Sequence, residues 1–142
     1  MFAIRATRSH SGPARVILAE DDKALRDVLA AVLRKAGYEV VEAADGTRLV
    51  DLMADELLQR DHLDAYDLII SDVRMPGWTG LEVLRSLRAA GDRTPVLLIT
   101  AFGDSGLHQE AFRLGVTSML DKPFDLATFR ARAQAALRSR AA

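Results

Sequence analysis

Residues 67–84 read DLIISDVRMPGWTGLEVL and contain a complete strand-turn-helix pattern. The run LIIS at residues 68–71 is a nearly unbroken apolar run, as expected for a strand covered on both faces of a parallel sheet. Pro76 and Gly77 then favour a turn, and the apolar residues from 81 to 87 follow at helical spacing. The segment therefore predicts a β-strand followed by an α-helix.

The same unit repeats along the chain. Further strands are expected at residues 15–19, 39–43, 96–100 and 116–120, and helices at 22–36, 46–58, 81–91, 107–114 and 126–137, the last opened by Asp125 as N-cap. Five such units predict an α/β fold with a doubly wound, five-stranded parallel sheet in the order 2-1-3-4-5.

Composition limits the class of protein. The chain has 142 residues, 49% of them hydrophobic, which indicates one soluble domain. Its 19 basic residues offset 20 acidic ones, so the overall charge does not indicate a protein that coats nucleic acid. The absence of cysteine excludes disulfides and thiol nucleophiles and suits a cytoplasmic location. No apolar run approaches the roughly 20 residues that span a bilayer. We expect a flexible tail at residues 1–14 and the domain at 15–142.

Polar residues follow the predicted strands where each one ends. Glu20 and Asp21 follow the first strand, Asp72 the third, Thr100 ends the fourth, and Lys122 follows the fifth. In a doubly wound sheet these ends meet at one crevice. Clustered carboxylates repel one another and need a cation, a shared proton or abundant water, and of the cations Mg²⁺ suits oxygen ligands of this kind. A carboxylate nucleophile, a divalent cation and a fixed lysine are the parts that formation of an acyl phosphate needs.

Four segments resemble the signature blocks of bacterial two-component receiver domains, especially those of transcriptional-activator-type regulators. They read VILAEDD (16–22), DLIISDVRMPGWTGLEVL (67–84), LLITAFGD (97–104) and MLDKPFDL (119–126). The resemblance implies a flavodoxin-like fold and a phosphoacceptor switch of a phosphorelay. A sensor histidine kinase or a histidine phosphotransfer protein would supply the phosphoryl group, and the surface of the last helices would change to regulate an output. The chain would be no enzyme beyond catalysing its own phosphorylation and dephosphorylation.

The resemblance also assigns the metal site. Asp72 would be the phosphoacceptor. Asp21, Asp72 and the main-chain carbonyl of Arg74 would hold Mg²⁺, with Glu20 acting through water.

Phosphoryl binding is assigned in the same way. Thr100, the main-chain N–H of Ala101, and Lys122 would bind the phosphoryl group, with a cis bond between Lys122 and Pro123. Arg74 and Phe102 each follow a site residue by two positions, so we expect their side chains to tune the rate of dephosphorylation.

Two features depart from the family pattern. The chain is longer than usual between residues 46 and 72, because of an enlargement by MADELLQRDH at 53–62. The switch position three residues before Lys122, usually aromatic, is Met119. Methionine adapts to irregular gaps, so Met119 either couples phosphorylation to the surface in an altered form or is plain core packing.

The expected partners follow from the same reasoning. A homodimer is expected through the helix at 107–114, the strand at 116–120 and the helix at 126–137. Neither a membrane nor direct nucleic-acid binding is expected, since the arginines near the C-terminus fit a solvated helix face. The three histidines, His10, His62 and His108, are interpreted as surface residues.

Two other functions use a similar fold or a similar nucleophile. Phosphatases of the haloacid-dehalogenase type place an acid two residues after the nucleophile, whereas this chain has Arg74 there. A flavodoxin-like flavin carrier needs a Ser/Thr/Gly-rich loop after the first strand, where this chain has the acidic run 20–22, which would repel a flavin phosphate. The sequence leaves open whether the domain acts alone or within a longer regulator.

Overall fold

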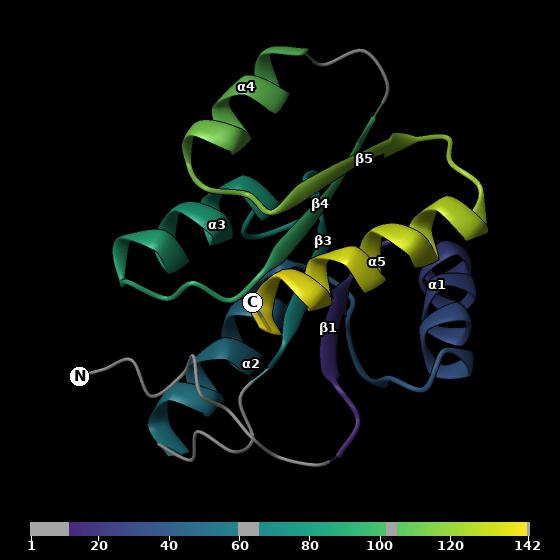
Figure 1. Cartoon of the computed structure of the whole chain (residues 1–142). Coiled ribbons are helices and arrows are strands. Elements are labelled where there is room, and N and C mark those ends of the chain that lie inside the picture. The colour runs from purple at the N-terminus through teal and green to yellow at the C-terminus, as the bar shows by residue number, and fades with distance from the viewer. Residues whose placement is uncertain (1–11, 60–65, 102–104, 142) are drawn as a thin grey trace.

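The computed structural model describes residues 12–59, 66–101 and 105–141. Within these residues five strands alternate with five helices along the chain (Figure 1). In order they are β1 (Arg15–Ala19), α1 (Lys23–Lys35), β2 (Glu39–Ala43), α2 (Gly46–Gln59), β3 (Leu68–Asp72), α3 (Gly80–Ala89), β4 (Val96–Ala101), α4 (Ser105–Arg113), β5 (Ser118–Lys122) and α5 (Leu126–Ala141).

The strands form one parallel sheet in the order β2-β1-β3-β4-β5. The predicted α/β class, strand order and parallel direction are therefore confirmed. All five residues of β3, the central strand, are buried, as the nearly unbroken apolar run predicted.

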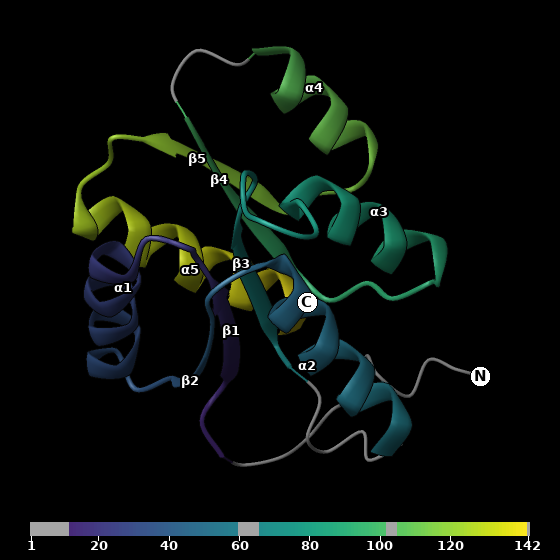
Figure 2. The same cartoon turned by 180° about the vertical axis from the view of Figure 1, so that it is seen from behind.

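Helices cover both faces of the sheet. One core cluster joins the sheet to α1 and α5 through Leu29, Leu33 and Phe129, and the two helices lie on the same face in Figure 1. The other cluster joins the sheet to α2, α3 and α4, and Figure 2 shows α2 and α3 from that face. Burying a large apolar side chain stabilises the fold by about 1.5–3 kcal/mol. The two clusters therefore stabilise the sheet whose carboxyl end carries the polar residues.

Side-chain caps fix where the helices begin. The carboxylate of Asp22 accepts from the N–H of Leu25 at 3.2 Å, and that of Asp125 from the N–H of Thr128 at 2.7 Å. The predicted cap at Asp125 is therefore confirmed. The hydrogen bond from the Thr128 N–H favours the ionised form of Asp125 and lowers the pKa of that carboxyl group.

The fifth strand begins two residues later than predicted. Gly115 has a φ of 94°, and the N–H of Val116 donates to the carbonyl of Ala111 at 3.0 Å, which closes the end of α4. Val116 is buried because it packs under this turn, not because it belongs to a strand. The strand therefore extends to Lys122, which becomes its last residue.

Arg88, near the end of α3, joins two connecting segments at the end of the sheet opposite the polar strand ends. Its Nε donates to the carbonyl of Gly115 at 3.1 Å. Its Nη1 donates to the carbonyls of Asp92 and Thr94 at 2.8 and 2.9 Å. One side chain thus links the segment after α3 to the turn after α4.

Some predictions fall on residues outside the described ranges. These are most of the tail at 1–14, Phe102, and the last three residues of the enlarged segment 53–62. The rest of that segment continues α2, which has 14 residues. Among the helices that the structure describes, none combines the length and the apolar character needed to cross a membrane.

Candidate functional site

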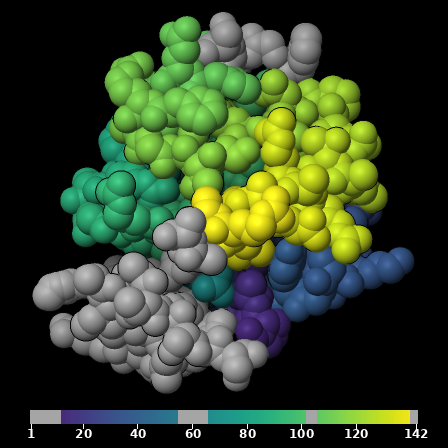
Figure 3. Space-filling view, in the orientation of Figure 1, coloured from purple at the N-terminus to yellow at the C-terminus, as the bar shows by residue number. Residues whose placement is uncertain are grey.

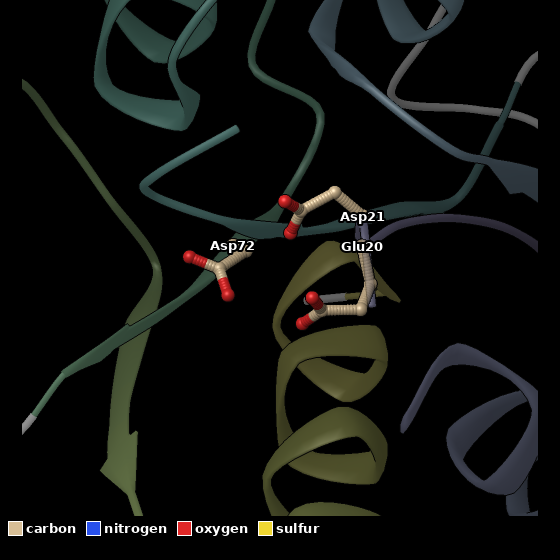
Figure 4. A group of neighbouring side chains, drawn as sticks. All are labelled: Glu20, Asp21 and Asp72. Atoms are coloured by element: carbon tan, nitrogen blue, oxygen red, sulfur yellow. The ribbon is translucent and has the colours of Figure 1, made fainter. Parts of the chain in front are cut away.

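Three carboxylates meet at the carboxyl ends of β1 and β3. Glu20 and Asp21 directly follow β1, and Asp72 is the last residue of β3. One oxygen from each of these side chains lies within 4.8 Å of the other two, and Figure 4 shows the three carboxyl groups turned toward a common space. Glu20 and Asp72 are buried, whereas Asp21 is exposed. The sequence predicted this group correctly because parallel strands end at the same edge of the sheet.

Lys122 supplies a positive charge to this group. Its Nζ lies 2.5 Å from Oδ2 of Asp72 and 3.4 Å from Oε1 of Glu20. Burial of the ammonium group acts to lower the pKa of Lys122, but the hydrogen bond and charge of Asp72, with those of Glu20, outweigh it and raise that pKa. Lys122 therefore stays charged and offsets part of the repulsion between the carboxylates.

Glu20 is the carboxyl group whose protonation the site perturbs most. Burial, together with the negative charge of Asp72, raises the pKa of Glu20 to about 7, although the Asp22 N–H and the Lys122 ammonium oppose this rise. A carboxylic acid with this pKa is only partly ionised at neutral pH. The positive charge of Lys122 therefore does not fully balance the carboxylates, and an additional cation next to Glu20 would be favourable.

The donor set fits a divalent cation with oxygen ligands. Three carboxyl oxygens within reach of one ion are the ligand type that Mg²⁺ prefers. A bound cation would favour the ionised form of Glu20, because its positive charge would offset the burial of the carboxylate and the negative charge of Asp72, both of which raise the pKa of Glu20.

The other predicted site residues lie around Asp72. The Arg74 main-chain N–H donates to Oδ1 of Asp72 at 2.8 Å. Thr100 is buried near the end of β4, and Ala101 is the exposed last residue of that strand. In the sheet register Ala101 is the partner of Lys122, so the ends of β4 and β5 lie side by side next to the carboxylates. The Lys122–Pro123 peptide bond is cis, as the resemblance implied.

Met119 is buried in β5. Its side chain belongs to the core cluster shared by α2, α3 and α4, and it pairs with Leu98 of β4. Its carbonyl accepts a hydrogen bond from the guanidinium group of Arg132 in α5. This environment agrees with core packing, and a coupling role stays a prediction.

Sequence reasoning missed two interactions next to the site. His108, interpreted as a surface residue, is half-buried, and its Nε2 lies 2.6 Å from Oδ1 of Asp121 in β5. Arg26 in α1 donates to the main-chain oxygen of Glu20 at 2.7 Å. No motif could have indicated either one, because each joins segments whose relative position only the folded chain defines.

Comparison with known sequences decides the family. A sequence model of the response regulator receiver domain matches residues 16–134. The chain belongs to this family. The predicted resemblance to bacterial two-component receiver domains is therefore confirmed.

The receiver domain has both curated and structural relatives. "Response regulator MprA" of Mycolicibacterium vanbaalenii is 37% identical over 126 residues, which are 89% of this chain and 51% of that protein. "Transcriptional regulatory protein FixJ" of Azorhizobium caulinodans is 38% identical over 125 residues, which are 88% of this chain and 54% of that protein. The chain thus spans about half the length of these relatives.

A solved structure of the chemotaxis response regulator CheY4 of Vibrio cholerae superposes with a TM-score of 0.72 at 32% identity. It covers 87% of this chain and 98% of that one. The receiver-type, flavodoxin-like fold is therefore shared along almost the whole of a known receiver.

The pKa of Glu20 makes the stability of the metal-free receiver domain depend on pH. Folded Glu20 keeps its proton up to about pH 7, whereas the unfolded chain releases it near 4.5, so the folded state binds more protons between these values. We expect the free energy of unfolding to fall as the pH rises through this window, by roughly 1–3 kcal/mol from this group.

Urea unfolding with EDTA at pH 5, 6, 7 and 8 measures this effect. Glu20→Gln cannot titrate and should lack this part of the pH dependence. An identical pH dependence in the wild type and in Glu20→Gln would contradict the assignment.

Proposed function

We propose that this receiver domain is the phosphoacceptor switch of a two-component phosphorelay and that Asp72 takes the phosphoryl group. The observation that carries the proposal is the position of Asp72. Its Oδ1 is held by the Arg74 N–H at 2.8 Å, its Oδ2 by Lys122 at 2.5 Å, and the carboxylates of Glu20 and Asp21 lie beside it. The donor would be a phosphohistidine of a sensor kinase or of a phosphotransfer protein in the cytoplasm.

The reaction needs little covalent work from the protein. A carboxylate oxygen of Asp72 attacks phosphorus and forms the acyl phosphate. The bond from phosphorus to the donor histidine nitrogen breaks, its electron pair stays on that nitrogen, and the donor ring carries a proton taken up from solvent, so that neutral histidine leaves. Lys122 then pairs with a phosphoryl oxygen. The Thr100 hydroxyl and the Ala101 N–H would donate to the other oxygens. Through these hydrogen bonds, the end of β4 would respond to phosphorylation.

Glu20, Asp21, Asp72 and the main-chain carbonyl of Arg74 would hold Mg²⁺, with Glu20 acting through water. When bound, Mg²⁺ would offset the negative charge that gathers on the phosphoryl oxygens. In this proposal the protein's part is to keep Asp72 aligned while Lys122 balances the charge on the other side.

Acetyl phosphate tests the proposal without a partner kinase. With Mg²⁺ present, the intact mass of the chain should increase by one phosphoryl group. EDTA should prevent the increase, because the carboxylates would then repel the incoming phosphoryl oxygens. If no phosphoryl group is added at any Mg²⁺ concentration, the proposed function fails.

The rate of dephosphorylation is proposed to depend on Arg74. Its side chain is exposed directly after the site, where it can crowd a water molecule that attacks the phosphoryl group. Arg74→Ala should speed autodephosphorylation several-fold, and replacing Phe102 by alanine as well should add to the change. Phosphate release from the purified phosphorylated domain measures the rate. Arg113→Ala, which removes an exposed arginine at the end of α4, should leave that rate unchanged.

The output is proposed to run through α4, β5 and α5. In Figure 3 the surfaces of α4 and of the segment containing β5 and α5 share one face of the molecule. The side chain of Phe112 in α4 is more than half exposed, at 55%. This surface is proposed for self-association, with Met119 as the adaptable side chain beneath it. Direct nucleic-acid binding is not part of the proposal.

A further inference from the structure

Arg26 connects α1 to the acidic pair. It lies one turn beyond the cap residue Asp22, and its Nη1 donates to the main-chain oxygen of Glu20 at 2.7 Å. Its side chain is largely buried, with 13% of its area exposed. Burial of a guanidinium group is unfavourable unless its N–H groups form hydrogen bonds, so the fold depends on this contact to keep Arg26 buried.

Glu42 in β2 holds Arg26 in place. Oε1 of Glu42 lies 3.3 Å from Nε of Arg26, and Oε2 lies 3.1 Å from Nη1 of Arg34, two turns further along α1. The planar guanidinium group of Arg26 therefore joins two acceptors, the carboxylate of Glu42 and the carbonyl of Glu20. Arg34 shares Glu42 but donates its other bond to Val40, away from the site.

The N–H, the carbonyl and the carboxylate of Glu20 all form hydrogen bonds. Its N–H donates to the carbonyl of Ala43 at 3.0 Å, its carbonyl accepts from Arg26, and its carboxylate accepts from the Asp22 N–H and from Lys122. The carbonyl belongs to the peptide group that joins Glu20 to Asp21. Fixing this peptide group therefore also fixes the direction in which Asp21 leaves the chain.

We propose that Arg26 is a positioning residue that orients Glu20 and Asp21 for the metal ion, through its hydrogen bond to the Glu20 carbonyl. The proposal rests on the proposed function, in which these carboxylates hold Mg²⁺. Partners that orient metal ligands in this way often change metal affinity by about 10–100-fold when they are removed.

The sign of the effect separates positioning from charge. Removing a cation close to a metal site reduces repulsion and should tighten Mg²⁺ binding. Removing a hydrogen bond that orients two ligands should weaken it. Arg26→Met removes both the charge and the bond, so a weaker Mg²⁺ affinity indicates that positioning is the stronger effect.

Urea unfolding at increasing MgCl₂, with ionic strength held constant, measures the affinity. An ion that binds the folded state raises the free energy of unfolding with a concentration dependence that gives its Kd, and the value without Mg²⁺ reports any general loss of stability separately. We expect Arg26→Met to raise the Kd about tenfold. Arg34→Met, which removes the same charge from the same helix and the same carboxylate, should leave the Kd at the wild-type value. Arg26→Lys, which keeps the charge and one donor, should restore part of the affinity.

The outcomes distinguish this inference from the function on which it rests. If Mg²⁺ does not stabilise the wild-type domain, the proposed function fails. If it does, and Arg26→Met binds Mg²⁺ as tightly as the wild type or more tightly, the positioning role is overturned while the proposed function stands. Equal weakening in Arg26→Met and Arg34→Met would also overturn it. Should Arg26→Met not fold, Arg26→Gln takes its place, since its shorter side chain does not reach the Glu20 carbonyl, and a wild-type Kd in that variant has the same consequence.

Discussion

Asp72→Asn will gain no phosphoryl group from acetyl phosphate and Mg²⁺ under conditions in which the wild-type chain gains one. An amide oxygen is a poor nucleophile compared with a carboxylate, and the substitution also removes one of the three acidic ligands. Labelling should therefore fall at least about 100-fold, to below detection by intact mass. The fold should persist, because the amide oxygen can still accept the hydrogen bond from the Arg74 N–H, while Lys122 keeps its contact with Glu20.

Asp27→Asn is the matched control for this loss. Asp27 is an exposed aspartate of α1 that pairs with Lys23, four residues away on the same helix. It should be labelled as the wild type is. Undiminished labelling of Asp72→Asn would show that Asp72 is not the phosphoacceptor.

Gly46→Ala should destabilise the domain by about 2–4 kcal/mol, a large effect for one added methyl group. A Cβ atom at this position would lie 1.8 Å from the carbonyl oxygen of Trp78 and 2.6 Å from its backbone N and C atoms. These are backbone atoms, so no rotation of a side chain can relieve the clash. The loop that carries Trp78 would have to move, and the 3.0 Å hydrogen bond from the Gly46 N–H to the carbonyl of Pro76 would be strained or lost.

Gly106→Ala provides the control, since a Cβ at Gly106 in α4 meets nothing within 4 Å. Alanine is the better helix former, so this variant should be equal to the wild type or more stable by about 0.5–1 kcal/mol. Urea denaturation measures both variants. A Gly46→Ala protein as stable as the wild type would show that the loop following Asp72 is not packed against α2 as described.

The sequence was most informative where periodicity and position coincide. The apolar runs of β3 and β4 predicted buried parallel strands, and from these alone Asp72 and Thr100 could be placed at a common edge. It was misleading at Val116, which was predicted to begin the fifth strand but belongs to the closure of α4. Burial has the same signature in a strand and under a turn, so only the backbone hydrogen bonds distinguish them.

The contacts that orient the site were beyond sequence reasoning for a different reason. Arg26 binds a main-chain carbonyl, and every residue has one, so no residue type marks the partner. The pairing of His108 with Asp121 depends on how α4 lies over β5, which sequence spacing does not define. Sequence motifs therefore indicate the residues that take part in the chemistry, whereas the residues that orient them are identified only in the folded structure.

Arg88 has a consequence for cooperativity. Because one guanidinium group satisfies the carbonyls of Asp92, Thr94 and Gly115, the segment before β4 and the turn before β5 share a single partner. A movement that pulls Arg88 away from one segment also removes a donor from the other. The part-buried bonds to the carbonyls of Asp92 and Thr94 and the exposed bond to Gly115 would then be lost together, which would destabilise the intermediate. We therefore expect the segment before β4 and the turn before β5 to open together in local unfolding, at the end of the sheet opposite the carboxylates.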